Sequence, residues 1–154
     1  MKTERRSALK KMLFSLAGLT GIGLTAKASA NYSEEKEAAN ITTYQNVPLF
    51  SGHTKFGNLV FVAGKGAHTE PFEIKAHTEI VLKELEAELK KAGSSMEKVL
   101  KVNVYLNDIA DFQGMNEIYK GRFGSKPPVR TTVGVAKGGV PGNSIVEMDC
   151  IAYI

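Results

Sequence analysis

The sequence predicts an α+β domain in which two helices cover one face of a single mixed β-sheet. An apolar strand pattern at 58–64 precedes a segment with helical periodicity, and a second strand pattern at 98–108 precedes a second helical segment. Two further strand patterns, 130–136 and 144–154, complete the order. Elements in this order form an α+β layer with one sheet face left uncovered. We expect that face to be buried in an oligomer.

One strand and one long helix make up the first part of the domain. The run NLVFVAG, 58–64, is apolar throughout and contains β-branched residues, which is typical of a strand covered on both faces. The segment 73–93 follows the 3.6-residue helical period. Its predicted inward face consists of Ile74, Val81, Leu85, Leu89 and Ala92. Gly93 then provides a helix stop, since glycine adopts the left-handed conformation at little cost.

The next strand and helix follow the same logic. The segment 98–108 alternates in polarity, which places Leu100, Val102, Val104 and Leu106 on one strand face. The segment 110–124 is predicted as a helix that begins at an Asp111 cap and ends at Gly124. Its inward side chains are Phe112, Met115, Tyr119 and Phe123.

The last two strands are predicted to form a hairpin through the Gly/Pro-rich loop KGGVPGN. In the final strand the apolar face consists of Val146, Met148, Cys150, Ala152 and Ile154, and the other face carries Glu147 and Asp149. If the apolar faces of both strands coincide, Arg130 lies opposite Asp149 and Thr132 opposite Glu147. Two interpretations remain open: a cross-strand salt bridge on a polar surface, or a pocket in which Arg130 binds a carboxylate and an acid handles a proton or water.

The first thirty residues are predicted to be a signal peptide rather than part of the fold. A basic start precedes fifteen apolar residues at 12–26, and ASA at 28–30 has the form of a cleavage site. The pair Arg5-Arg6 is typical of the twin-arginine export route. We therefore expect a periplasmic protein without stable membrane association after cleavage. An uncleaved anchor and a cytoplasmic location are the alternatives. Residues 31–40 are polar and predicted to be a flexible leader to a domain at 41–154.

Without residues 1–30 the chain has 14 Lys+Arg against 15 Asp+Glu, so its basic balance of +4 belongs to the signal. A nucleic-acid partner, which requires a basic surface on the folded domain, is therefore not expected. Cys150 is the single cysteine, so no intrachain disulfide is possible, and its position on the apolar face predicts an inert buried thiol. The histidines at 53, 68 and 77 lack metal-ligand spacing, and no metal site is predicted.

The stretches GNLVFVAGKG at 57–66 and PPVRTTVGVAKGGVPGNSIVEMDCIAYI at 127–154, together with the helix–strand–helix region between them, resemble the RidA family, also called YjgF/YER057c/UK114. The resemblance covers about 48–154. It implies a chorismate-mutase-like domain that forms a homotrimer and binds small ligands in clefts between subunits. It also implies hydrolysis of enamine or imine acids, such as 2-aminoacrylate and 2-iminopropanoate, to 2-keto acids and ammonia without a cofactor.

The resemblance also implies roles for individual residues. Arg130 corresponds to the arginine that holds the substrate carboxylate, and Thr132 lines the pocket. The backbone of Gly64 contacts the substrate. Asp149, with Glu147 two residues earlier, corresponds to the acid that positions the attacking water, and Phe50 stands where the family has a tyrosine.

Two departures leave the activity open. Asp149 replaces the usual glutamate and shortens the side chain by one methylene, and Phe50 lacks a phenol to donate a hydrogen bond. Non-catalytic binding of small carboxylates is therefore the alternative function. RNA cleavage is a third hypothesis, which the near-neutral charge disfavours. Export favours a different imine from those known for this family in the cytoplasm.

Overall fold

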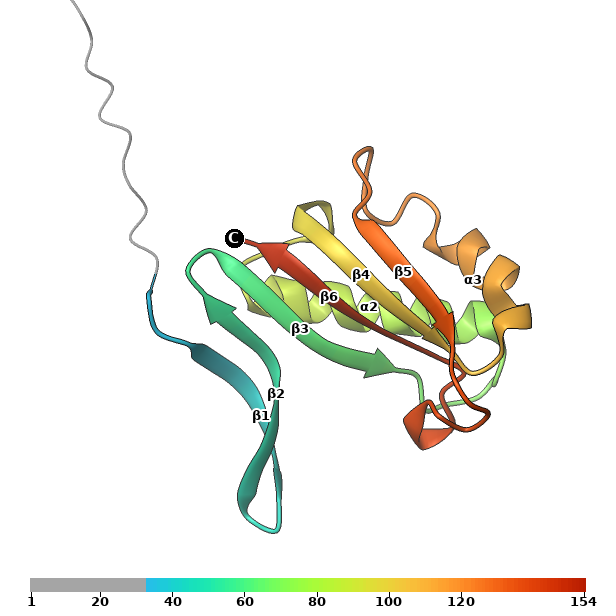
Figure 1. The fold of residues 1–154 in the computed structure, drawn as a ribbon, viewed down its shortest axis with the longest axis horizontal. Helices are drawn as coiled ribbons and strands as arrows, with labels where there is room; N and C mark the ends of the chain where they lie inside the picture. The colour runs from blue at the N-terminus through green and yellow to red at the C-terminus, as the bar shows by residue number, and fades with distance from the viewer. Residues whose placement is uncertain (1–32) are drawn as a thin grey trace, which may run out of the picture. The chain divides into compact units, whose positions relative to one another are not determined.

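A computed structural model of the chain describes residues 33–154, so the predicted signal at 1–30 lies outside the described residues (Figure 1). The strands are β1 (Glu37–Tyr44), β2 (Val47–Phe56), β3 (Leu59–Gly66), β4 (Val99–Leu106), β5 (Val129–Gly134) and β6 (Val146–Tyr153). The helices are α2 (Ile74–Lys91) and α3 (Phe112–Tyr119), with short 3-10 helices at Met96–Lys98, Ile109–Asp111 and Pro141–Asn143. None of the described helices is both long and apolar enough to span a membrane.

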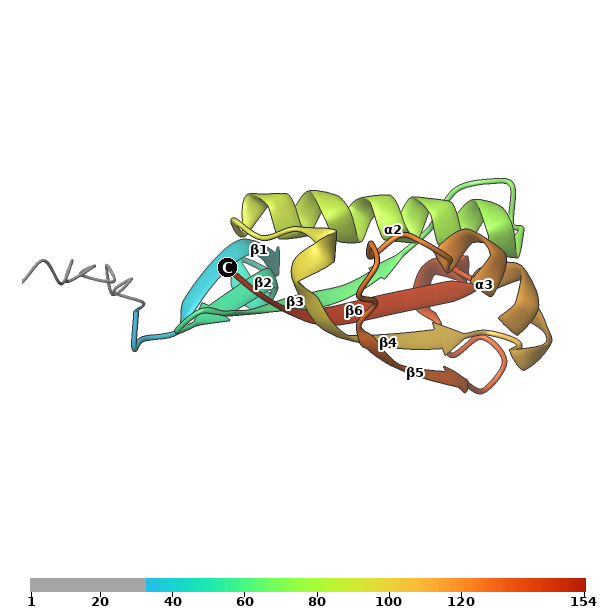
Figure 2. The ribbon, with the colours of Figure 1, turned by 90° about the horizontal axis from the view of Figure 1, so that it is seen from above.

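The six strands form one mixed sheet in the order β1-β2-β3-β6-β4-β5, in which only the β4–β5 pair is parallel. Both helices lie on the same face of this sheet, which confirms the predicted α+β class (Figure 2). Helix α2 contributes the centre of the core, and its side chains Val81, Leu82, Leu85 and Leu89 are fully buried. They pack against the apolar face of β6 that the alternation predicted, Val146, Met148, Cys150 and Ala152.

One predicted helix stop is confirmed, and three other details differ from the sequence predictions. Gly93 follows α2 with a φ of +83°, as expected for a left-handed helix stop. Helix α3 ends at Tyr119, before the predicted stop at Gly124, because Gly121 already adopts a φ of +77°. Asp111 makes no side-chain cap. Leu100 is exposed rather than inward, since a bulge between Val99 and Lys101 buries Val99 instead.

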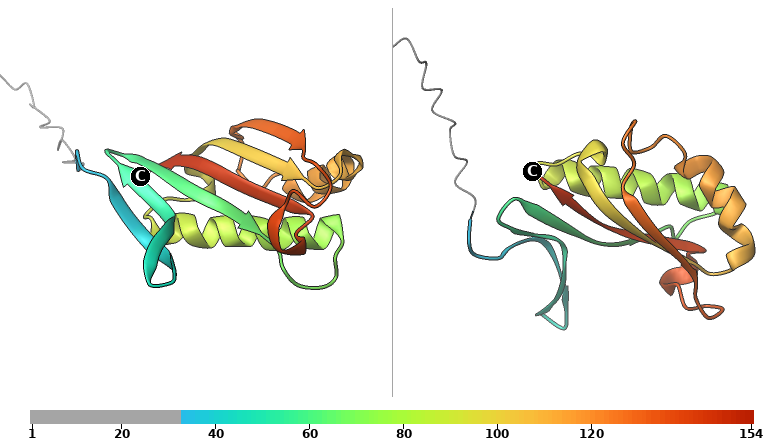
Figure 3. Two further views of the ribbon diagram at one scale, coloured as in Figure 1. Left: turned by 60° about the horizontal axis from the view of Figure 1, so that its bottom comes forward. Right: turned by 45° about the horizontal axis from the view of Figure 1, so that its top comes forward.

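The β1–β2 hairpin was not predicted from the sequence. Strand β1 begins at Glu37 and so includes the last four residues of the expected leader, 31–40. Nearly all of β1 and the first half of β2 are exposed, so these strands lack the alternation that identifies a half-buried strand. Figures 1 and 3 show the hairpin at the opposite edge of the sheet from β5.

The predicted β5–β6 hairpin is wrong. Strand β5 crosses over to pair in parallel with β4 at the sheet edge, and β6 is inserted between β3 and β4. The loop that joins them is therefore not a tight turn but a longer connection that contains the 3-10 helix Pro141–Asn143. This topology determines which side chains can share a site.

Candidate functional site

The open face of β6 carries the two predicted acids, as the alternation indicated. Asp149 lies between two polar side chains of β4. Asn103 donates from Nδ2 to Oδ1 at 2.8 Å, and the Tyr105 hydroxyl donates to Oδ2 at 2.9 Å. The hydrogen bond to Asp149, assisted by burial, raises the pKa of Tyr105 above its ordinary value, so the phenol stays protonated and continues to donate. Both oxygens of Asp149 are thus engaged within the chain.

Glu147 occupies a different environment from Asp149. It is half-buried, and among residues 33–154 its carboxylate has no hydrogen bond or ion pair. It lies over the backbone of Gly64, where a Cβ atom would stand only 2.8 Å from Glu147 Cδ. Gly64 sits in the irregular stretch of β3 between Val62 and Lys65, so the chain bulges there. Glycine at this position allows a free carboxylate to approach the backbone closely.

A shallow hollow of about 260 Å³ lies beside this point, lined by Ser51, Thr54, Phe61, Val62 and Ala63. Phe50, the residue before Ser51, projects from β2 with 54% of its surface exposed. Phe61 and Ile151 pair across β3 and β6 and continue the open face. The predicted substrate-binding residues Phe50 and Gly64 therefore both adjoin one end of this hollow, Phe50 next to Ser51 on β2 and Gly64 next to Ala63 on β3.

Arg130 does not join this group, and its predicted partnership with Asp149 is wrong. Arg130 pairs with Val102, which in turn pairs with Cys150, so Arg130 and Thr132 point to the helix-covered side of the sheet. The residue of β5 in the same row as Asp149 is Thr131. The sequence interpretation failed because it aligned the apolar residues of β5 with the core. At the sheet edge Val133, one of the two residues so aligned together with Val135, is exposed on the open face instead, as is Val129.

Arg130 lies against helix α3. Its guanidinium carbon is 4.6 Å from the centroid of the Tyr119 ring and 5.6 Å from that of Phe112. Its Nη1 reaches Met115 Sδ at 4.0 Å, a weak contact. Within the described part of the chain Arg130 forms no ion pair. The hydroxyls of Tyr119 and Thr132 nearby are buried without a hydrogen-bond partner.

A buried polar cluster around Glu88 was missed by sequence analysis. Glu88 of α2 is 3% exposed. It accepts hydrogen bonds from Asn40 at 2.6 Å and His53 at 2.8 Å, and it pairs with Lys65 at 3.5 Å and Lys91 at 3.6 Å. Burial alone raises the pKa of Glu88, but these partners outweigh it and lower the pKa to about 2. The signal was present in the sequence, because position 88 follows Val81 by seven and Leu85 by three on the apolar face.

Two further residues considered in the sequence, His77 and Cys150, are buried in the core. His77 is fully buried, with Nε2 3.0 Å from the carbonyl of Thr69 and Nδ1 accepting from the Ile145 amide at 3.3 Å. Cys150 is buried, as predicted, and burial raises the pKa of its thiol to about 12, which disfavours the reactive thiolate. Among residues 33–154 no group of three or more His, Cys, Asp or Glu side chains is arranged to hold a metal ion.

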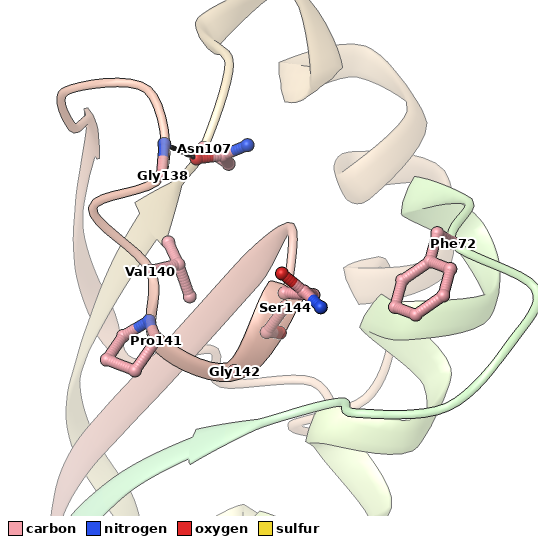
Figure 4. A pocket seen from close by; sticks show the side chains of 8 residues that line it. Phe72, Asn107, Gly138, Val140, Pro141, Gly142 and Ser144 are labelled. Carbon is pink, nitrogen blue, oxygen red and sulfur yellow. Dashed lines mark hydrogen bonds between the residues drawn. The ribbon is translucent and has the colours of Figure 1, made fainter.

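A separate cavity of about 460 Å³ lies at the end of the sheet, between Phe72 and the loop that joins β5 to β6 (Figure 4). Its lining consists of Phe72, Asn107, Gly138, Val140, Pro141, Gly142, Asn143 and Ser144. The side-chain Oδ1 of Asn107 accepts a hydrogen bond from the Gly138 amide at 2.7 Å and holds the loop in place. Loop residues line this cavity, and none of the predicted site residues does. We therefore do not take it as the candidate active site, although it is larger than the hollow beside Gly64.

Comparison with known proteins shows that most of the chain matches one protein family. A family model described as "Endoribonuclease L-PSP" matches residues 27–154. The chain is 33% identical over 137 residues to "Reactive Intermediate Deaminase A, chloroplastic" of Arabidopsis thaliana, which covers 82% of this chain and 72% of the relative. It is 30% identical over 116 residues to "2-iminobutanoate/2-iminopropanoate deaminase" of Dermatophagoides farinae, covering 71% and 89% respectively.

A solved structure supports the same relationship. The crystal structure of RidA from the Antarctic bacterium Psychrobacter sp. aligns with a TM-score of 0.64 at 32% identity. The alignment covers 75% of this chain and 98% of that chain. The likeness therefore extends over most of the chain rather than over a single motif.

Proposed function

The chain belongs to the RidA (YjgF/YER057c/UK114) family, and we propose that it hydrolyses small enamine or imine acids of the 2-aminoacrylate and 2-iminopropanoate type. The products are a 2-keto acid and ammonia. Two relatives named as deaminases, at 30% and 33% identity, support this class of reaction. The specific substrate is part of the proposal.

One observation carries the proposal: the Glu147 carboxylate is uncommitted and lies over the backbone of Gly64 on the open face. In the proposed reaction Glu147 accepts a proton from a water molecule as its oxygen attacks the imine carbon. The proton then goes to the nitrogen and gives a carbinolamine. Glu147 next moves the proton of the new hydroxyl to the amine nitrogen, the carbon–oxygen double bond forms, the carbon–nitrogen bond breaks, and ammonia leaves. One imine and one water thus yield one keto acid and one ammonia. Asp149, with both oxygens occupied, holds Asn103 and Tyr105 in place beneath the site rather than activating the water.

Arg130 supplies the carboxylate clamp in this proposal, since its planar fork matches a carboxylate in a bidentate manner. Arg130 and Glu147 point to opposite faces of one sheet, so a single chain cannot bring both to one substrate. We propose that two copies contribute to each site within a homotrimer with a chorismate-mutase-like arrangement. The exposed apolar side chains Phe61, Val129 and Val133 on the open face support such an assembly. Size-exclusion chromatography with light scattering tests for three copies.

The test is hydrolysis of 2-iminopropanoate, generated in situ by an amino-acid oxidase acting on alanine, with the purified full-length chain. We expect faster decay of the imine, with matching release of pyruvate and ammonia. Glu147→Gln is expected to lower the rate by about 100-fold or more, as for loss of a general acid–base, and Arg130→Ala to raise KM. Asp149→Asn is expected to change the rate only a few-fold. No acceleration over the spontaneous reaction would refute the proposal.

Non-catalytic binding of small carboxylates is the second candidate function. It is favoured by Phe50, which has no hydroxyl to assist catalysis, and by Arg130, which has no ion-pair partner among the described residues. Binding of pyruvate that is lost in Arg130→Ala, without imine turnover, would support this alternative. RNA cleavage, which the name of the family model suggests, is disfavoured by the 14 to 15 charge balance of residues 31–154. A synthetic RNA incubated under the same conditions is expected to remain intact.

We also propose that the protein acts in the periplasm after removal of residues 1–30. The basic start, the apolar run and the ASA sequence support this location. Cell fractionation combined with N-terminal sequencing tests it. A mature protein that begins near Asn31 in the periplasmic fraction is the expected result, and an uncut chain in the cytoplasm would contradict it.

A further inference from the structure

One face of helix α3 forms a cradle for the Arg130 side chain. The three side chains concerned, Phe112, Met115 and Tyr119, lie at positions i, i+3 and i+7, which places them in a row on one side of the helix. All three contact the guanidinium: the Phe112 and Tyr119 rings lie 5.6 Å and 4.6 Å from its carbon, and Met115 Sδ lies 4.0 Å from Nη1. The cradle is therefore made of two aromatic rings and a thioether, with no carboxylate.

The Tyr119 ring is itself held in place. It packs against Phe123 with ring centroids 4.9 Å apart, and Phe123 is 97% buried. Burial raises the pKa of Tyr119 to about 12, so the phenol is neutral and does not act as a phenolate partner for the arginine. What Tyr119 offers to Arg130 is its ring, through the attraction between a cation and an aromatic quadrupole.

Stacking and hydrogen bonding use different parts of a guanidinium. An aromatic ring attracts the cation without using its N–H groups, whereas a carboxylate binds at the edge through two parallel N–H donors. A neighbouring carboxylate would occupy that edge, but among residues 33–154 Arg130 has no ion pair. The cradle thus fixes the side chain and leaves its strong donors to a ligand.

We propose that Tyr119 is a positioning residue for the substrate carboxylate, which orients the N–H edge of Arg130 by stacking and does not itself touch the substrate. This inference rests on the role of Arg130 in the proposed function. It adds that the affinity for carboxylate ligands is set partly by the aromatic ring at position 119, and not by the hydroxyl.

The experiment measures binding of 2-oxobutanoate, a keto acid of the product class, to the full-length chain by isothermal titration calorimetry. Butan-2-one serves as the ligand without a carboxylate. Tyr119→Phe keeps the ring and removes the hydroxyl. Tyr119→Leu removes the ring. Phe123→Leu is the matched control, because it removes the neighbouring ring of the same stack, which is not among the groups that contact Arg130.

We expect Tyr119→Leu to weaken 2-oxobutanoate binding by about 3- to 10-fold, as for loss of a partly desolvated cation–π contact. Tyr119→Phe and Phe123→Leu should stay within about 2-fold of the wild type. In an Arg130→Ala background the further change to leucine at 119 should have no effect, because the ring then has no cation to orient. In turnover assays Tyr119→Leu should raise KM and leave kcat within about 2-fold.

Equal losses in Tyr119→Leu and Phe123→Leu would show a merely structural role and overturn the inference. Unchanged affinity in Tyr119→Leu would do the same, even if imine hydrolysis is observed. Failure of the proposed function has a different signature, because imine hydrolysis would then be absent while Arg130-dependent binding of 2-oxobutanoate could still be measured. Absence of any Arg130-dependent binding would overturn both.

Discussion

Two carboxylates on opposite sides of the sheet, Glu88 and Glu147, contrast sharply in their surroundings. Glu88 is buried beneath α2 and has four partners from three strands and its own helix. Glu147 is half-buried on the open face and has none among the described residues. A buried charge whose partners are complete stabilises the fold, whereas an accessible charge without partners is available for a ligand or a proton. The contrast separates a structural acid from a proposed functional one.

The largest effect is expected from removing the structural acid. Glu88→Ala leaves His53, Asn40 and Lys65 without their acceptor, and should lower the free energy of unfolding by about 3 kcal/mol. Chemical denaturation measures the loss. Glu86→Gln on the same helix is the control, because Glu86 only forms an exposed pair with Lys90 and should cost less than about 0.5 kcal/mol. Equal stabilities for the two variants would contradict a structural role for Glu88.

The pH dependence of stability tests the same comparison. The pKa of Glu88 is about 2 in the folded protein against an ordinary value of 4.5, so its contribution is present above pH 4.5 and is lost as the pH falls toward 2. The full contribution is about 3 kcal/mol. The stability difference between wild type and Glu88→Gln should therefore shrink between pH 4.5 and pH 2. A difference that stays constant over this range would refute the lowered pKa.

A glycine lies against each of the two acids, so each acid can be displaced without being substituted itself. A Cβ at Gly52 would lie 2.7 Å from Glu88 Oε1, and one at Gly64 would collide with the Glu147 carboxylate. Gly52→Ala should destabilise the fold by about 1–3 kcal/mol, as for overpacking of a filled interior. Gly64→Ala should lower kcat for imine hydrolysis about 10-fold with less effect on stability, since Glu147 can move toward solvent. If Gly52→Ala lowered kcat and Gly64→Ala lowered the stability instead, the assignment of Glu88 as the structural acid and Glu147 as the functional acid would be reversed.

The smallest effect is expected at the hydroxyl of Tyr105. Tyr105→Phe removes one of the two hydrogen bonds to Asp149, and should cost about 1 kcal/mol in unfolding free energy while the rate changes less than about 2-fold. Denaturation and turnover measured on the same preparation check this. A rate loss comparable with that of Glu147→Gln would move the catalytic role back to Asp149.

The sequence predicts those parts of this fold in which one face is buried. The periodicity of α2 and the alternation of β6 identify the core side chains Val81, Leu85, Met148 and Cys150 correctly, because burial imposes a pattern on the residues. The β1–β2 hairpin lacks such a pattern, since most of its side chains are exposed. It could not be found by periodicity.

The candidate site was predicted in its residues but not in its arrangement. Glu147 and Asp149 lie on the expected face of β6. Arg130 of β5 lies on the other face of the sheet from them, contrary to the prediction. The prediction failed because strand pairing is a long-range property, which a Gly/Pro-rich loop suggests but does not determine. The Glu88 cluster was overlooked although an acid on an apolar helix face was visible. A charge at such a position indicates partners elsewhere in the chain.

The central position of β6 has a consequence for folding. Strand β6 is the last strand in chain order, yet it joins β3 to β4 and so links the two halves of the sheet. Until β6 is synthesised, β1–β3 and β4–β5 share no strand pairing, and the apolar face of α2 lacks one of the strands that cover it. Folding of this domain is therefore expected to be delayed until β6 has been synthesised, because the contacts that join the two halves of the sheet are distant in sequence.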